Sequence, residues 1–131
     1  MVKLLRALPL LLLLTACRKK PDVRLKVLSG ATTIVAPGAQ AIPDSIIVIA
    51  GTKIRSVGMR KDIPVTGAAD RTDFGGEWIV PAEGARIAVD ETANLIILKH
   101  APNGVTPANP SDISARINAG EWEVPKTNNR P

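Results

Sequence analysis

The sequence has one histidine and one cysteine among 131 residues, and it has no tyrosine. A metal ion that activates water needs about three protein ligands in one cleft, and a disulfide needs two cysteines. His100 precedes Ala101 and Pro102 at the end of an apolar run, and we interpret it as a surface histidine. The composition therefore predicts no catalytic metal, no cofactor and no intrachain disulfide.

Motifs that carry catalysis are also scarce. Gly75-Gly76 lacks the Lys-Ser/Thr and the following helix of a phosphate loop, and no serine has the context of a nucleophile elbow. Asp70 and Asp73 could share a strand edge, but a general acid–base pair also needs a cleft and a shifted pKa, and the sequence indicates neither. Adjacent residues such as Asp90-Glu91 fit a solvated turn better. We expect no catalytic residues.

Aromatic side chains are limited to Phe74, Trp78 and Trp122, so aliphatic residues must fill the interior. An exposed pair of tryptophans could stack on a sugar. Both tryptophans, however, fall within predicted strands, and tryptophan is usually largely buried. Packing on the strands is therefore the favoured interpretation.

Positive charge is scarce in the predicted folded region, although the whole chain has 17 Lys and Arg against 12 Asp and Glu. Residues 25–125 contain nine basic and eleven acidic side chains, whereas Arg18, Lys19, Lys20 and Arg24 fall in the short segment 18–24. Nucleic-acid binding needs a basic surface with interleaved aromatics, so no nucleic-acid partner is expected. The basic segment either stays solvated, which is the favoured interpretation, or rests on anionic headgroups.

Sustained helical periodicity is missing after the first residues, and short β-branched runs alternate with Gly, Pro, Asp and Asn. This pattern predicts an all-β fold, a small sandwich or barrel-like domain of short, mostly antiparallel strands. The predicted strands are 45–50, 53–57, 77–80, 86–89, 94–98 and 121–124, with hairpins at Gly51-Thr52, Gly75-Gly76 and Ala119-Gly120. A bulge or a twist is expected at Arg55-Ser56. Residues 113–118 form a further strand, although a short helix competes at 113–117.

The N-terminus has the form of a bacterial export signal. Lys3 and Arg6 precede five leucines at 10–14, an apolar core shorter than the ~20 residues of a membrane-spanning helix. Leu14-Thr15-Ala16-Cys17 then resembles the lipobox of bacterial lipoproteins, which implies lipidation of Cys17. The alternative is a plain secretory signal that is cleaved after Ala16.

These patterns divide the chain into four parts: a helical signal peptide at 1–16, a lipidated tether at 17–24, a β-sandwich at 25–125 and a disordered tail at 126–131. The anchor would hold the protein at the membrane of the bacterial cell envelope. Arg18, rather than an aspartate, follows the cysteine. In a Gram-negative cell this resemblance implies the outer membrane, facing the periplasm.

Two regions resemble the composite β-sandwich of the amidohydrolase superfamily, which is assembled from both ends of those enzymes. I-I-V-I-A-G-T-K-I-R-S-V-G at 46–58 and D-F-G-G-E-W-I-V-P at 73–81 resemble its N-terminal part. R-I-A-V-D-E-T-A-N-L-I-I-L at 86–98 and I-N-A-G-E-W-E-V at 117–124 resemble its C-terminal part. Asp90 stands where the family usually has glycine, and Ala82 replaces another expected glycine.

The catalytic barrel of that family is absent between the two regions. A (β/α)₈ barrel of about 250 residues should follow Val80 together with a His-x-His motif, but only residues 81–85 separate Val80 from Arg86. Because an inserted domain needs entry and exit points that lie close together, this segment can close the sandwich as an exposed link.

The resemblance without the barrel leaves three hypotheses. The first is a non-catalytic, lipid-anchored binding or scaffolding module, with a protein partner on the face that would pack against a barrel. The second is a subunit that completes an amidohydrolase, a C–N bond hydrolase, in trans with a separate barrel chain. The third is a vestigial deletion product.

Replacing the proposed lipid acceptor tests the predicted anchor. Cys17→Ser removes the thiol, so labelling with a fatty-acid analogue should be abolished and maturation of the chain should stop. Metabolic labelling followed by mass spectrometry of the N-terminal peptide measures both effects. Normal processing and membrane retention of the variant would contradict the lipoprotein interpretation.

Overall fold

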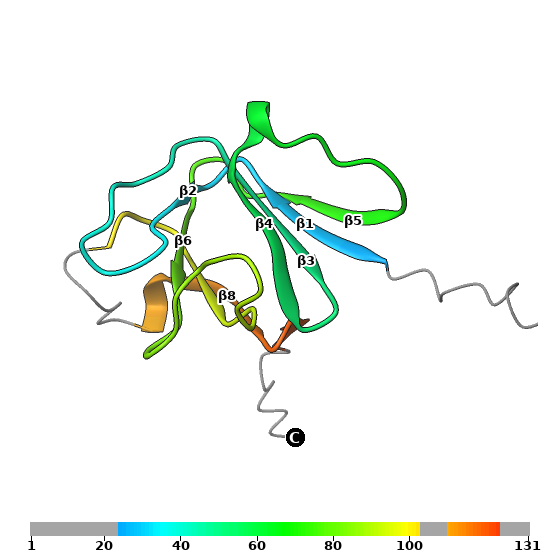
Figure 1. Cartoon of the computed structure of the whole chain (residues 1–131). Helices are drawn as coiled ribbons and strands as arrows, with labels where there is room; N and C mark the ends of the chain where they lie inside the picture. Colours follow the sequence, from blue (N-terminus) through cyan, green and yellow to red (C-terminus); the bar gives the residue numbers. More distant parts are fainter. Residues whose placement is uncertain (1–23, 103–109, 124–131) are drawn as a thin grey trace, which may run out of the picture.

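The computed structural model describes residues 24–102 and 110–123, which form two β-sheets packed face to face (Figure 1). Within these ranges the only helical elements are two short 3-10 turns, η2 (Arg60–Asp62) and η3 (Pro110–Asp112). The all-β prediction is therefore confirmed. The predicted signal, tether and tail at 1–16, 17–23 and 126–131 lie outside the described residues.

The first sheet has the strand order β4-β3-β1-β5. Its strands are β1 (Leu25–Ser29), β3 (Ser45–Ala50), β4 (Lys53–Met59) and β5 (Ala69–Asp73). β3 pairs antiparallel with both β1 and β4, whereas β1 and β5 run parallel. Five of the six residues of β3 are buried, as expected for a central strand that is apolar on both faces.

The second sheet has the order β2-β6-β7-β8-β9. Its strands are β2 (Thr32–Thr33), β6 (Trp78–Pro81), β7 (Leu95–Leu98), β8 (Ile113–Asn118) and β9 (Glu121–Trp122). β2 and β6 are parallel, and the other pairs are antiparallel. Residues 113–117 are therefore in a strand and not in the competing short helix.

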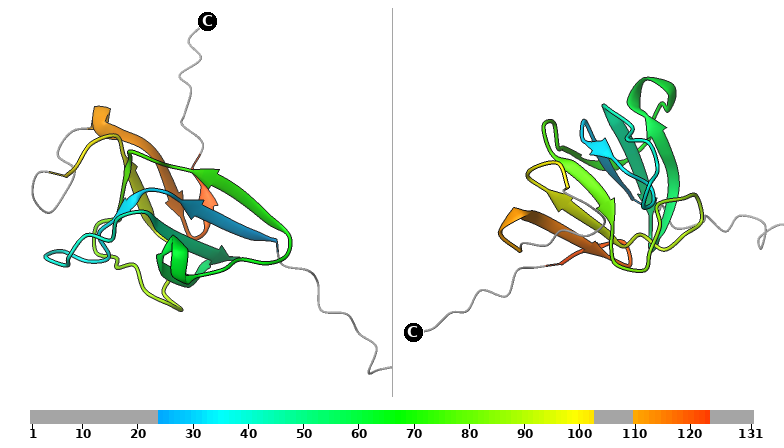
Figure 2. Two further views of the ribbon diagram at one scale, coloured as in Figure 1. Left: turned by 90° about the horizontal axis from the view of Figure 1, so that it is seen from above. Right: turned by 90° about the vertical axis from the view of Figure 1, so that its left-hand side faces the viewer.

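A single apolar interior lies between the two sheets, whose arrangement is seen in the two views of Figure 2. Alternate residues of each strand point into it, because side chains on a strand alternate between the two faces. The inward-facing residues on the strands of both sheets are Leu28, Ile47, Ile49, Ile54, Ile79, Leu95, Ile97 and Ile117. Both sheets therefore depend on the same buried surface.

Both outer faces are also partly apolar. On the first sheet, Val27, Ile46 and Val48 are covered by side chains of the segment between η2 and β5, among them Ile63 and Val65. On the second sheet, Val80, Ile96 and Leu98 form a third buried cluster with Trp78 and Ile113. The second of these outer faces carries the candidate site.

The hairpin at Gly51-Thr52 is confirmed, and so is its bulge. β3 pairs with β4 from Ala50↔Lys53, and the register shifts so that Ile49 faces Ile54 while Val48 faces Ser56. Arg55 is the extra residue of this bulge. The bulge allows Ile54 and Val57 to contact the same interior although they are three residues apart.

The predicted strand at 86–89 is wrong. Ile87 is buried and its N–H donates to the Val35 oxygen, but residues 82–94 form turns and coil apart from one isolated bridge at Thr92. The Glu91 N–H donates to the Ala88 oxygen, and Asp90 has a positive φ of 71°. The β-branched residues Ile87 and Val89 favoured a strand. The chain instead turns at residues 89–90, and within 86–89 only the Ile87 side chain is buried in the interior.

The predicted hairpin at Gly75-Gly76 is also wrong. These glycines connect β5 in the first sheet to β6 in the second, so the two flanking strands never pair with each other. A local turn signal does not identify the partner of a strand. The polar, exposed β5 instead pairs with β1, and the buried β6 pairs with β7. The two parallel pairs make both sheets mixed, but the other five strand pairs are antiparallel, so the prediction of mostly antiparallel strands is confirmed.

Strand ends differ by small amounts from the predicted ones. The strand expected at 121–124 ends at Trp122, and residue 124 lies outside the described ranges. The expected 77–80 and 94–98 are observed as Trp78–Pro81 and Leu95–Leu98. Within the predicted link 81–85, only Glu83 and Gly84 are exposed, because Pro81 closes β6 and the flanking alanines are half-buried.

Two turns hold the sheets together at one end of the sandwich. Gly120, in the β8–β9 turn, lies so close to Gly51 and Thr52 that a Cβ atom on it would overlap the Gly51 carbonyl oxygen. Nearby, the Lys26 ammonium donates to the Gly120 carbonyl oxygen, and only 18% of the Lys26 side chain is exposed. Contacts between the sheets are therefore both apolar and polar at this end.

The shared interior predicts a large cost for a truncation in it. Ile97 is fully buried, at 0% exposure, and it packs with residues of both sheets. Ile97→Ala should lower the free energy of unfolding by about 2–5 kcal/mol, because it removes buried methyl groups and leaves a cavity. Chemical denaturation followed by circular dichroism measures the change. Separate transitions for the two sheets would contradict a single cooperative domain.

The close approach of the two turns gives a paired prediction. Gly51 and Gly120 both have positive φ, 64° and 82°, but only Gly120 has atoms where a Cβ would lie. Gly51→Ala should therefore cost only the roughly 1–2 kcal/mol of left-handed strain, while Gly120→Ala should cost more. Equal thermal unfolding midpoints for the two variants would show that the turns do not pack as described.

Candidate binding site on the outer face of the second sheet

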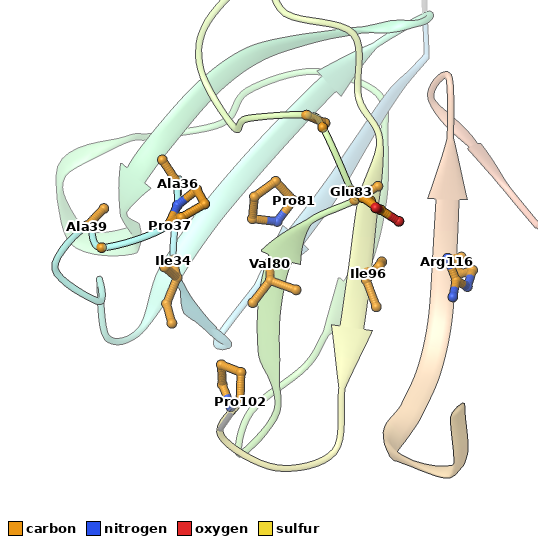
Figure 3. A pocket seen from close by; sticks show the side chains of 14 residues that line it. Ile34, Ala36, Pro37, Ala39, Val80, Pro81, Glu83, Ile96, Pro102 and Arg116 are labelled. Atoms are coloured by element: carbon orange, nitrogen blue, oxygen red, sulfur yellow. The ribbon is translucent and has the colours of Figure 1, made fainter. Parts of the chain in front are cut away.

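A pocket with a volume of about 550 Å³ lies on the outer face of the second sheet, and we call it the outer pocket. Its floor consists of Ile34, which follows β2, Val80 on β6 and Ile96 on β7. The sheet register places these side chains in one row, because Val80 is opposite Ile96 and the Ile34 N–H donates to the Ile79 oxygen. Figure 3 shows the row running across the strands.

The rim of the outer pocket is built from two loops and a proline. One loop spans residues 36–39 and is closed by a hydrogen bond from the Ala39 N–H to the Ala36 oxygen, 3.0 Å long. The other is the link 81–85, where the Ala85 N–H donates to the Ala82 oxygen at 2.9 Å. Pro102 borders the pocket on a further side (Figure 3). Because proline fixes φ, much of this rim is conformationally restricted.

Two charged residues lie among the lining of the outer pocket. Arg116 on β8 is directly opposite Ile96 and continues the row of the floor, and Glu83 belongs to the link. Both side chains are exposed. Within the described ranges neither forms an ion pair or a side-chain hydrogen bond. The pocket thus combines an apolar floor with two charges that remain open to a ligand.

This combination suits binding. Aliphatic and proline side chains offer neither a nucleophile nor a proton donor, whereas small apolar residues with a few polar groups are typical of recognition surfaces. Across the ranges 24–102 and 110–123, no group of three or more His, Cys, Asp or Glu residues is arranged to hold a metal ion.

His100 lies on the surface, as interpreted from the sequence. Its side chain is 77% exposed, and its Nδ1 is 3.6 Å from an Asp112 carboxylate oxygen. The two aspartates considered as a pair have separate partners. Asp70 accepts a hydrogen bond from the Arg24 guanidinium at 2.7 Å, and Asp73 accepts one from the Gly75 N–H at 2.9 Å.

Asp90-Glu91 forms the expected turn. Asp90 has a φ of 71°, in the left-handed region that favours glycine, and Glu91 pairs with Arg86 at 3.0 Å. Asp90 occupies the position at which the resembled family usually has glycine. The backbone at Asp90 therefore adopts a conformation that glycine adopts most easily.

The two tryptophans pack against different apolar clusters and do not form a pair. Trp78 is half-buried against Val80 and Leu98 on the outer face of the second sheet. Trp122 packs on the interior, with its ring 5.8 Å from that of Phe74. The favoured packing interpretation of the tryptophans is therefore confirmed.

The predicted lipidation residues, Leu14, Thr15, Ala16 and Cys17, lie outside the described residues. Among the residues that are described, no helix is long and apolar enough to cross a membrane. Lipidation of Cys17 stays a prediction.

Sequence reasoning did not identify Ile34, residues 36–39 or Arg116 as parts of a site. One signal was present, because Leu95–Leu98 is apolar at four consecutive positions and a strand with one solvated face would alternate. Such a run indicates that both faces of β7 are covered. It does not show that loops from residues 36–39 and 81–85 meet over the outer face.

Comparisons with known proteins give a partial similarity. No family model and no curated protein matches the chain. A molinate hydrolase structure is 27% identical over 46% of this chain and 13% of its own, with a TM-score of 0.41. A protein described as a prolidase of Bifidobacterium longum is 21% identical over 47% of this chain and 16% of its own, also with a TM-score of 0.41.

These two neighbours are amidohydrolase-type hydrolases. The chain spans less than one fifth of the length of either structure.

Proposed function

We propose that this protein is a non-catalytic, lipid-anchored binding module, and that it docks a protein partner on the outer pocket. The observation that carries the proposal is the position of the pocket. Its rim includes the link 81–85, where the resembled family inserts its barrel, and its floor is apolar. We infer that this is the face that would pack against a barrel in those enzymes, because the link 81–85 borders the apolar hollow.

The outer pocket favours a partner with an apolar projection. Val80 and Ile96 are 7% and 5% exposed, so the floor alone offers little additional area. The rim adds the apolar surfaces of Pro37, Pro81 and Pro102. Because these residues have few rotamers, ordering them on binding costs little conformational entropy. An inserted aliphatic or aromatic side chain would contact floor and rim together, as anchor residues of interfaces do.

Arg116 and Glu83 give the proposed interface its orientation. Exposed charges at the rim of an interface contribute more to specificity and association rate than to affinity. A partner that presents an acidic group toward Arg116 and a basic group toward Glu83 would dock in one direction. The expected footprint is therefore a central apolar anchor flanked by opposite charges.

The position of the link 81–85 also supports a second candidate function. If the partner is a barrel polypeptide without its own sandwich, this chain completes a C–N bond hydrolase in trans. Hydrolysis by the isolated partner, measured with and without this protein, separates the two functions. Activity that requires both chains supports the trans subunit, whereas an unchanged activity supports the binding module.

Site-specific photo-crosslinking of the full, membrane-associated protein tests the docking surface. A photoreactive amino acid at position 39, on the rim, should give one discrete adduct with a partner protein. The matched control places the same amino acid at Lys61, which is exposed in η2 and does not line the pocket. Arg116→Glu should reduce the adduct from position 39 several-fold, because it reverses the charge in the row of the floor.

Thermal unfolding provides the control for the Arg116→Glu variant. Thermal unfolding of Arg116→Glu should match that of the original protein, since Arg116 is exposed and makes no side-chain bond within the described ranges. Identical adducts from positions 39 and 61, or an adduct that Arg116→Glu leaves unchanged, would contradict docking on the outer pocket. Absence of any adduct would favour the vestigial deletion product.

A further inference from the structure

Three chain segments meet at one end of the sandwich, and the tether leaves from the same end. Leu25, the first residue of β1, is opposite Ala50, and Ala50 is opposite Lys53 across the β3–β4 turn. The β8–β9 turn joins them, because Gly120 packs against Gly51 and Thr52. Whatever precedes Leu25 in the sequence must therefore begin beside the β3–β4 turn.

Two cations at this end are open to solvent. Lys53 and Arg55 are exposed, and within residues 24–102 and 110–123 neither forms an ion pair. The other basic residues there are engaged, Lys26 with the Gly120 oxygen and Arg24 with Asp70. We call Lys53, Arg55 and the Gly51-Thr52 turn the basic end.

Acidic residues also lie near the basic end. Asp90 donates its N–H to the Ile54 oxygen, and Glu121 is 4.0 Å from the Lys26 ammonium. Neither is paired with Lys53 or Arg55. The sequence of the tether then adds Arg18, Lys19 and Lys20 against a single acid, Asp22. Tether and basic end together have a positive net charge, unlike residues 25–125 as a whole.

We propose that the basic end rests on the anionic surface of the membrane that holds the lipid anchor, an inference that relies on the lipidation in the proposed function. From Cys17 to Leu25 the chain can extend at most roughly 28 Å, so the anchor confines the basic end near the headgroups. Within a Debye length of ~8 Å at physiological salt, Lys53 and Arg55 are attracted to anionic lipid. The lipid anchor and the attraction of Lys53 and Arg55 to the headgroups are each weak alone, and both favour the membrane-bound state.

This orientation has a consequence for the outer pocket. The chain enters β1 on one side of the sandwich, while β2 and β6 lie on the other side (Figure 1). With the basic end on the headgroups, the loop 36–39 points away from the bilayer. The outer pocket is then accessible to a soluble partner or to the soluble part of a membrane protein.

Spin labelling of the lipidated, full-length protein tests the orientation. Cys17 is the only cysteine and its thiol is consumed by the lipid, so an introduced cysteine is labelled alone. Thr52→Cys places the label at the basic end, and Gln40→Cys is the control beside the loop 36–39; both original residues are exposed. The readout is accessibility to a water-soluble relaxation agent in phosphatidylglycerol and in phosphatidylcholine vesicles.

The expected result is protection at position 52 in phosphatidylglycerol vesicles only, with position 40 accessible in both. Lys53→Gln with Arg55→Gln should weaken the docked state about fivefold for each charge removed. The matched variant Lys61→Gln with Lys99→Gln removes the same charge from exposed sites elsewhere and should leave the protection unchanged.

Two results would overturn the proposal. One is equal accessibility of position 52 in both types of vesicle, and the other is equal loss of protection in the two double variants. Mass spectrometry of the Cys17 peptide reports the anchor independently. A lipidated protein without protection contradicts the orientation alone, whereas an unlipidated protein contradicts both the orientation and the lipid-anchored function.

Discussion

The apolar contact between the inner faces of the two sheets is the interaction on which the rest of the structure depends. Leu28 and Ile47 come from the first sheet, and Ile79, Leu95 and Ile97 come from the second. Neither sheet could bury these side chains without the other. The contact also joins residues before the link 81–85 with residues after it, and both regions carry the family resemblance. Strand pairing, turn packing and the position of the outer pocket all follow from this contact.

The second sheet is apolar on both faces, and this property connects the fold to the proposed function. Its inner face is used by the interior, while Val80 and Ile96 on the outer face form the floor of a hollow. The proposed function takes this face to be the one that would contact a barrel in the resembled family. The link 81–85 and the loop 36–39 border this outer face. The hollow on this face is the surface on which the proposed partner would dock.

Much of the fold could be predicted because strand formation depends on local patterns. The buried run at 45–50, the turn at Gly51-Thr52 and the bulge near Arg55 are all encoded within a few residues. The two errors have a common cause. Residues 86–89 and the turn at Gly75-Gly76 have strand and hairpin signals, but their structure depends on partners far away in the sequence. A local signal cannot distinguish a hairpin from a crossing between two sheets.

The sequence by itself determined the class of fold, the solvated position of His100 and the scarcity of metal ligands, because these depend on composition and on side-chain alternation. Tertiary structure decided which strands pair in parallel, and it placed Ile34 and Arg116 at the ends of one row with Val80 and Ile96 between them. It also brought the start of β1 beside the β3–β4 turn. Such neighbours are set by the register of strands that are distant in sequence, and register is fixed by the burial of the whole interior at once.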